Sequence, residues 1–238
     1  GGMDTTLPGP GPHWRPRAVV FDCDGVLMDT ESAWARVQAQ VAESFGVTLD
    51  ERAGTSLMGL SAADVARDIS RRAAAVAEQR DEPAPGFDAV YERLVRTEED
   101  VVGEVLEPLP GAIETVRACA QRVPVAVASN STRGILDRKM HAIGLADVVV
   151  TWVSAQDVPR GKPAPDIYEE AARRLGVEPA DALAVEDSPA GTAAAVAAGL
   201  WVLGVPHGHD EPITSHFRAE SLADPAVGDM LRVWGLPL

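Results

Sequence analysis

Cysteine and lysine are scarce in this 238-residue sequence. The only cysteines, Cys23 and Cys119, lie far apart and form neither a CxxC pair nor a zinc-binding pattern. A reducing compartment therefore needs no special assumption, and we expect a cytoplasmic protein. The only lysines are Lys139 and Lys162, in a chain that otherwise uses arginine. Because the composition avoids lysine, the one retained between a glycine and a proline at 161–163 favours a specific role for Lys162.

Positive charge and long apolar runs are also lacking. The formal net charge is -15 at pH 7, and so acidic a protein repels nucleic-acid phosphates and anionic lipid. The most apolar run, 193–205, is too short to cross a bilayer and is broken by Gly199 and Gly204. No cationic start followed by an apolar segment is found, so no signal peptide is predicted. We expect no nucleic-acid or membrane partner; the oligomeric state stays open, with a monomer favoured.

Most of the chain alternates between strand and helix patterns. Residues 1–16 are rich in glycine and proline, and we expect a disordered leader there. Apolar strands that alternate with helices predict a doubly wound α/β fold, in which helices cover both faces of a parallel sheet. The predicted strands are 17–21, 123–128, 148–153, 182–185 and 200–205, and the predicted helices of this part are 113–121, 133–143, 165–175, 190–198 and 221–232.

The stretch between the first two strands has no strand pattern. Its apolar spacing predicts helices at 31–45, 64–80 and 87–102, with Ser61 as the N-cap of the second. We therefore predict an all-helical cap inserted after the first strand. The expected domains are an α/β core at 17–30 and 107–238, and a helical cap domain at 31–106.

Two acids follow the first strand directly. Asp22 and Asp24 flank Cys23, and Gly25 then lets the backbone turn closely over whatever the carboxylates hold. Like charges that are desolvated together repel, so a cation or a proton must neutralise them, and a divalent metal is the favoured answer. On a strand the side chain of Cys23 points away from both acids, so we interpret it as an inert core thiol.

Other polar residues follow the later strands. Because ligands of an open parallel sheet bind beyond the carboxyl ends of its strands, we expect these side chains to gather with the two acids. They supply carboxylates, a hydroxyl, backbone N–H groups at a helix start and an ammonium, which suits Mg²⁺ together with a phosphate. They are Ser129-Asn130-Ser131, Gly161-Lys162-Pro163 and Glu186-Asp187-Ser188.

This ordered set resembles the four motifs of the haloacid dehalogenase-like hydrolases, in the branch of phosphatases and phosphomutases with a helical cap. The resemblance covers about residues 17–205. It implies that Asp22 is the nucleophile that forms an aspartyl phosphate, and that Asp24 first protonates the leaving oxygen and then activates water. The phosphate-binding residues that it implies are Gly25, Ser129, Asn130 and Lys162, and the implied Mg²⁺ ligands are Asp22, the backbone carbonyl of Asp24, Glu186 and Asp187.

Elementary electrostatics supports these roles. A carboxylate that attacks a phosphate dianion meets repulsion, which Mg²⁺ and Lys162 would relieve. Within the family, dehalogenases lack the second acid, so the presence of Asp24 argues for phosphoryl transfer. Phosphonoacetaldehyde hydrolases need a cap lysine, and residues 30–108 contain none.

β-Phosphoglucomutase is the nearest alternative, because residues 57–64 resemble its cap loop and 161–166 its core motif. That enzyme carries a cap histidine and a phosphate-binding arginine where this chain has Trp34 and Ala62. We therefore predict a phosphatase acting on a small phosphorylated metabolite such as a sugar phosphate. The mutase stays open because nearby arginines could hold a second phosphate: Arg67, Arg71 and Arg72. A catalytically silent phosphate- or partner-binding protein is the alternative from another class, and the intact motifs disfavour it.

Two features receive no site role. The stretch His207-Gly208-His209-Asp210 has a spacing that a metal could use, but such loops are more often simply polar. Trp34 and the apolar stripe of the helical block are interpreted as packing rather than as substrate contacts.

Overall fold

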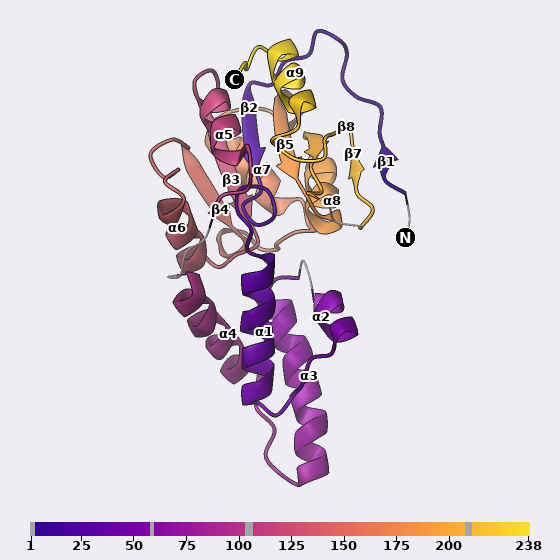
Figure 1. Ribbon diagram of the computed structural model, residues 1–238, viewed down its shortest axis with the longest axis vertical. Coiled ribbons are helices and arrows are strands. Elements are labelled where there is room, and N and C mark those ends of the chain that lie inside the picture. The colour runs from indigo at the N-terminus through magenta and orange to yellow at the C-terminus, as the bar shows by residue number, and fades with distance from the viewer. Residues whose placement is uncertain (1–2, 58–59, 103–106, 208–210) are drawn as a thin grey trace.

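A six-stranded parallel sheet forms the centre of the computed structural model, which describes residues 3–57, 60–102, 107–207 and 211–238 (Figure 1). The strand order is β4-β3-β2-β5-β6-β8, and every neighbouring pair is parallel. The predicted doubly wound sheet is therefore confirmed. The strands are β2 (Ala18–Phe21), β3 (Val125–Ser129), β4 (Thr151–Ser154), β5 (Ala182–Glu186), β6 (Trp201–Gly204) and β8 (Phe217–Arg218).

Helices cover both faces of this sheet because alternate residues of each buried strand point to opposite sides. Val19 and Phe21 share one buried cluster with α5 (Ala112–Ala120), α6 (Arg133–Ala142) and α9 (Pro225–Val233). Ala18 and Val20 share the other with α7 (Asp166–Leu175) and α8 (Pro189–Ala198). The predicted elements match within a few residues, except that the 148–153 strand begins at Thr151 and the last helix begins at Pro225. Single 3-10 turns occupy Ala155–Asp157 and Pro179–Asp181.

The regular elements in the described part of the block between β2 and α5 are helices. It contains α1 (Glu31–Ser44), α2 (Glu51–Leu57), α3 (Ala62–Arg80) and α4 (Phe87–Val102), and it lies below the sheet in Figure 1. Its own apolar cluster includes Val41, Ile69 and Leu94. The Ser61 hydroxyl accepts a hydrogen bond from the Asp64 N–H, as the N-cap prediction required. Helix α2 escaped prediction because its seven residues, with Gly54 among them, carry little apolar periodicity.

The prediction of a disordered leader at 1–16 is wrong for its described residues. Strand β1 (Thr5–Thr6) pairs with β7 (Thr214–Ser215) in a small parallel sheet beside the main one (Figure 1). Trp14 packs edge-on against Trp201 and Trp234. A glycine- and proline-rich composition indicates a lack of local structure, but these contacts join residues about two hundred positions apart, so no local pattern reports them.

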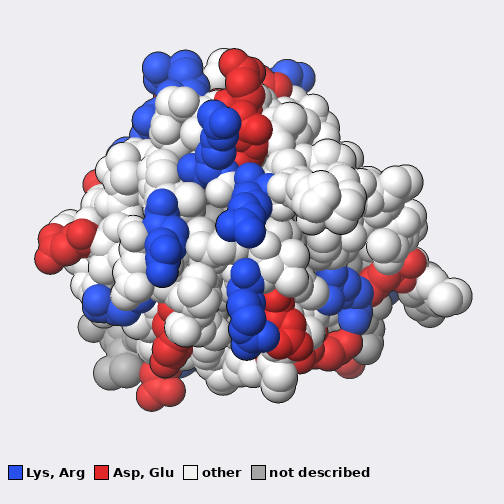
Figure 2. Space-filling view, turned by 90° about the horizontal axis from the view of Figure 1, so that it is seen from above, with Lys and Arg blue, Asp and Glu red and all other residues white. Residues whose placement is uncertain are grey.

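The surface charge and the helix lengths relate to the two classes of partner that the sequence disfavours, nucleic acids and membranes. Figure 2 views the end of the core opposite the helical block, where arginine side chains gather near the middle and acidic groups are interspersed. Both lysines are buried, so arginine supplies the surface cations. Within the described ranges, none of the helices combines the length and the apolar character that a membrane crossing requires.

Candidate active site

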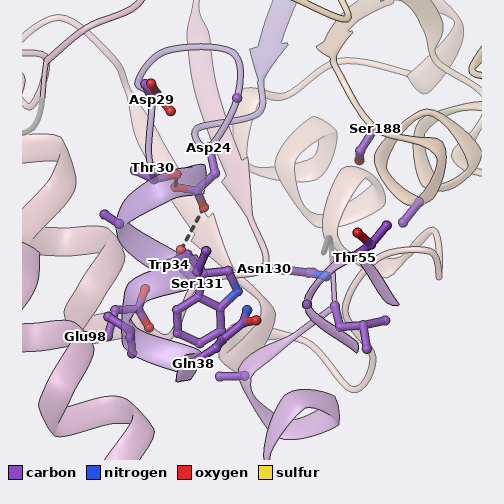
Figure 3. A pocket seen from close by; sticks show the side chains of 18 of the residues that line it. Asp24, Asp29, Thr30, Trp34, Gln38, Thr55, Glu98, Asn130, Ser131 and Ser188 are labelled. Carbon is purple, nitrogen blue, oxygen red and sulfur yellow. Dashed lines mark hydrogen bonds between the residues drawn. The ribbon is translucent and has the colours of Figure 1, made fainter. Parts of the chain in front are cut away.

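A cavity of about 720 Å³ lies between the carboxyl ends of the core strands and the helical block. Asp22, Asp24 and Lys162 line it from the core, and Trp34 and Gln38 line it from α1. Figure 3 shows this arrangement, with side chains from both parts of the molecule turned toward the same space. The structure therefore brings most of the predicted site residues to one place.

Three carboxylates gather at the core end of this cavity. Phe21 of β2 pairs in register with Val185 of β5, so Asp22, just after β2, lies beside Glu186, the last residue of β5. Oxygens of Asp22, Glu186 and Asp187 lie within 4.8 Å of one another, and all three residues are buried. Burial and the neighbouring Glu186 raise the pKa of Asp22 well above its usual value, and the same causes raise that of Asp187 to about 7. This donor set fits a hard cation such as Mg²⁺.

Lys162 offsets part of this negative charge. Its ammonium lies 3.0 Å from Asp22 Oδ1 and 2.7 Å from Glu186 Oε1, and it donates to the Ala128 carbonyl at 2.8 Å. Burial alone would lower the pKa of Lys162, but the two carboxylates raise it. Asn130 holds the lysine's backbone from both sides, since its Oδ1 accepts from the Lys162 N–H at 2.8 Å and its Nδ2 donates to the Lys162 carbonyl at 3.1 Å.

Asp24 faces a different set of groups. Its Oδ1 accepts hydrogen bonds from Thr30 Oγ1 at 2.6 Å and from Lys139 Nζ at 2.8 Å. Its Oδ2 accepts from Ser131 Oγ at 3.1 Å and, at 3.4 Å, from Ser129 Oγ. Burial opposes ionisation, but the Lys139 ammonium and these donors lower the pKa of Asp24. The carboxylate of Asp24 is thus held apart from the three-acid cluster, and only its backbone carbonyl is a candidate metal ligand.

The structure adds Lys139, which the sequence analysis did not assign to the site, and shows that Ser131, one of the side chains expected to gather there, contacts Asp24. Lys139 is only 3% exposed although it lies on helix α6. Its acidic partners, Asp24 and Glu98, lie far away in the sequence, so the one available signal was the rarity of lysine. Ser131 follows the predicted Ser129, and its position beside two other polar residues concealed which hydroxyl faces the cavity.

The remaining predicted phosphate ligands occupy distinct positions. Ser129 is fully buried and is not among the cavity-lining residues, whereas Asn130 and Ser131 are. The hydroxyl of Ser129 accepts a hydrogen bond from the Ser131 N–H at 3.0 Å, which shapes the turn after β3. Gly25 has φ of 80°, and a Cβ there would lie 1.9 Å from Asp187 Oδ2. Only glycine permits this close approach between the two loops.

The second wall of the cavity comes from helix α1. Trp34 was predicted to serve packing alone; it does pack on the apolar cluster of the helical block, but its indole also lines the cavity (Figure 3). Gln38 lies one turn further along α1, is 3% exposed and also lines the cavity (Figure 3). An amide that lines a cavity is suited to bind a polar group of a ligand.

The arginines that kept the mutase alternative open are engaged elsewhere. Arg67 pairs with Asp64, and both Arg71 and Arg72 pair with Asp68 on the outer surface of α3. None of the three lines the cavity, where the described cations are the two lysines alone.

Cys23 lies in the apolar core, and burial raises the pKa of its thiol well above its usual value, as expected of an inert residue. Of the His207–Asp210 stretch, residues 208–210 lie outside the described residues. His207 has φ of 49° and does not belong to the acidic cluster.

Comparisons with known proteins point to one family. A family model described as haloacid dehalogenase-like hydrolase matches residues 16–199. Hexitol phosphatase B of Escherichia coli strain K12 is 30% identical over 220 residues, which cover 90% of this chain and 96% of that protein. A bifunctional riboflavin kinase/FMN phosphatase of Arabidopsis thaliana is 31% identical over 228 residues, 92% of this chain but only 56% of the longer plant protein. A crystal structure of a HAD family hydrolase from Deinococcus radiodurans R1, with bound phosphate and sodium, is 33% identical, has a TM-score of 0.64 and is covered to 99%, against 94% of this chain.

Proposed function

This chain belongs to the haloacid dehalogenase-like hydrolases, and on that premise we propose that it is a Mg²⁺-dependent phosphatase of a small phosphorylated metabolite, with an aspartyl-phosphate intermediate. One observation carries the proposal. The Asp22 carboxylate contacts the Lys162 ammonium and also belongs to a cluster of three buried acids at the core end of the cavity. The names of two relatives, a hexitol phosphatase and an FMN phosphatase, support the same class of reaction.

The reaction divides between the two acids of the first loop. Asp22 attacks the phosphorus of the substrate and forms an acyl phosphate, while the bond from phosphorus to the leaving oxygen breaks. The protonated form of Asp24 donates its proton to that oxygen. The resulting carboxylate, the form that the Lys139 ammonium favours, then accepts a proton from the water that attacks the phosphorus, and the bond between phosphorus and Asp22 breaks. The Lys162 ammonium, 3.0 Å from Asp22, stabilises the charge on the phosphoryl oxygens during both steps.

Asp22, Asp187 and the backbone carbonyl of Asp24 are the residues that would hold Mg²⁺. Glu186 already accepts hydrogen bonds from Tyr168 at 2.5 Å and Lys162 at 2.7 Å, so we assign it to the surroundings of the metal. When bound, the ion neutralises the nucleophile and the phosphate and lowers their mutual repulsion.

The cavity wall favours a sugar phosphate with a single phosphate group. Its described cations are Lys162, beside the nucleophile, and Lys139, which pairs with Asp24 and Glu98. The wall offers an aromatic face at Trp34 and an amide at Gln38, groups that suit an uncharged hydroxylated molecule. A mutase must hold a second phosphate, for which this wall supplies no further cation among the described residues.

We also propose that the helical block at 31–106 is a cap domain, separate from a core at 17–30 and 107–238. The buried cluster within the helices, around Val41, Ile69 and Leu94, supports this division. In this view the chemistry belongs to the core, and the cap selects the substrate.

The purified protein is expected to release phosphate from p-nitrophenyl phosphate only when Mg²⁺ is present, and from at least one member of a panel of hexose and hexitol phosphates. No phosphate release from any of these compounds would reject the phosphatase and favour the silent binding protein. With β-glucose 1-phosphate as substrate, free phosphate should form faster than glucose 6-phosphate. Isomer formation that outpaces release would instead identify a mutase.

The affinity for Mg²⁺ is expected to depend on pH. A carboxyl group loses its proton before it binds the metal, so a raised pKa weakens binding below that pKa and has no effect above it. Because the pKa of Asp187 is about 7 in the metal-free protein and that of Asp22 is also raised, the half-saturating Mg²⁺ concentration should fall as the pH rises through about 7.

Calorimetric titrations with MgCl₂ at several pH values would measure this dependence. The exposed Asp29 lines the same cavity outside the acidic cluster, so Asp29→Asn serves as a control that keeps the profile. A Mg²⁺ affinity that is constant across the range would contradict the assignment of Asp187.

A further inference from the structure

Lys139 occupies a position that the proposed reaction does not yet use. Its ammonium is buried and contacts three groups: Asp24 Oδ1 at 2.8 Å, Ser131 Oγ at 2.9 Å and Glu98 Oε1 at 3.6 Å. An unpaired ammonium is costly to bury, so a lysine remains charged in such a place only when acids surround it. Burial alone would lower the pKa of Lys139, and the carboxylates of Asp24 and Glu98 raise it instead.

The three charged groups, Asp24, Lys139 and Glu98, come from different parts of the molecule. Asp24 lies in the loop after β2, Lys139 on α6 of the core, and Glu98 on α4 of the helical block. Figure 3 shows Asp24, Ser131 and Glu98 in the same part of the cavity. The side chain of Glu98 is 12% exposed, so its ion pair with Lys139 lies in a site with little water.

We propose that Lys139 is a positioning residue for Asp24 and that Glu98 couples this positioning to the helical block. The inference rests on the proposed function, because it takes Asp24 as the group that exchanges a proton with the leaving oxygen. A carboxylate that accepts from Thr30, Lys139 and Ser131 has one favoured orientation. Without the ammonium, Asp24 can turn among several rotamers, and a misplaced proton donor slows the transfer.

Glu98 sets the charge around this lysine. With Asp24 it places two carboxylates around one ammonium, so Lys139 is shared between the core loop and helix α4. The orientation of Asp24 therefore depends on whether α4 lies against α6. Elements α4 and α6 are in direct contact in this structure, so the cap and the proton donor are mechanically linked.

The test compares two leaving groups in the Lys139→Met variant. p-Nitrophenolate departs without a proton, whereas a sugar hydroxyl must receive one. We expect kcat/KM for the hexose phosphate that the wild type hydrolyses fastest to fall by about 10²-fold, the usual scale of general acid catalysis. The value for p-nitrophenyl phosphate should fall much less. Lys139→Arg keeps the charge, so its ratio of kcat/KM between the two substrates should be close to that of the wild type.

Equal losses with both substrates would overturn the proposal, because a purely structural role affects every substrate alike. Competitive inhibition by inorganic phosphate gives a second readout. It should be unchanged in Lys139→Met, and a weaker inhibition would show instead that Lys139 binds the phosphate itself. A wild-type protein that hydrolyses neither compound would reject the proposed function, which keeps the two failures distinguishable.

The coupling to α4 has its own variant, which leaves the Asp24–Lys139 pair in place. Glu98→Gln should lower kcat/KM severalfold for the hexose phosphate and leave p-nitrophenyl phosphate unaffected. Glu99→Gln is the matched control, since Glu99 lies next in the same helix but does not line the cavity. Thermal unfolding of each variant would establish that it is folded. An unchanged substrate ratio in Glu98→Gln would remove the coupling from the proposal.

Discussion

The Asp22→Asn variant is expected to lose essentially all turnover, on the order of 10⁶-fold, which is the scale of removing a covalent nucleophile. The amide has nearly the shape of the carboxylate but cannot form the acyl phosphate. Asp22 is 7% exposed beside Glu186 and Asp187, and its raised pKa shows that the fold disfavours its ionised form. An acid of this kind lowers stability above its unfolded-state pKa, so the neutral amide should leave the metal-free protein equally or more stable at neutral pH.

Phosphate release and thermal unfolding of Asp22→Asn would be measured together. Asp29→Asn is the matched control, an exposed acid that lines the same cavity and should keep its activity. A variant at position 22 that still turns over at a tenth of the wild-type rate would show that another group attacks the phosphorus.

The Lys162→Met variant should show the second-largest effect, a loss of about 10³-fold in kcat/KM. Its ammonium contacts the nucleophile at 3.0 Å and Glu186 at 2.7 Å. Methionine has a similar length and no charge, so both the phosphoryl group and the buried acids lose their cation. Inhibition by inorganic phosphate should weaken in parallel, because ground-state binding and the transition state use the same ammonium.

The neighbouring cation supplies the control for this experiment. Arg160 is largely exposed and pairs with Asp166 outside the cavity, so Arg160→Gln should leave the kinetics unchanged. Removing one partner of a buried ion pair costs about 3–5 kcal/mol, so Lys162→Met should also unfold at a lower temperature without Mg²⁺. Normal inhibition by phosphate in Lys162→Met would contradict the role of the lysine.

The grouping of the proposed active-site residues could be predicted from the sequence because these residues follow strands. A strand in a parallel sheet has a fixed end, so Asp22, Lys162 and Asp187 could be placed together from local patterns and strand order alone. The short α/β elements matched for the same reason, since apolar runs and terminal glycines mark where each one ends.

The missed features all depend on contacts between distant residues. Lys139 lies on an ordinary amphipathic helix, and only the tertiary structure brings it to Asp24, 115 positions away. The pairing of β1 with β7 is equally non-local. Trp34 packs on the apolar cluster of the helical block and also lines the cavity, but the apolar periodicity of the helix indicates only the packing. The need for glycine at position 191 is also hidden, because it arises from Glu186, whose Oε2 would lie 1.9 Å from a Cβ there.

In the proposed reaction Asp22 carries the phosphoryl group during turnover. Rapid acid quenching of the wild-type protein during hydrolysis of p-nitrophenyl phosphate, followed by mass spectrometry of its peptides, would detect that group. A phosphoryl group on Asp22, absent in Asp22→Asn and lost when the substrate is exhausted, is the predicted result. A phosphoryl group on another residue, or steady turnover with an unmodified Asp22 at every quench time, would contradict it.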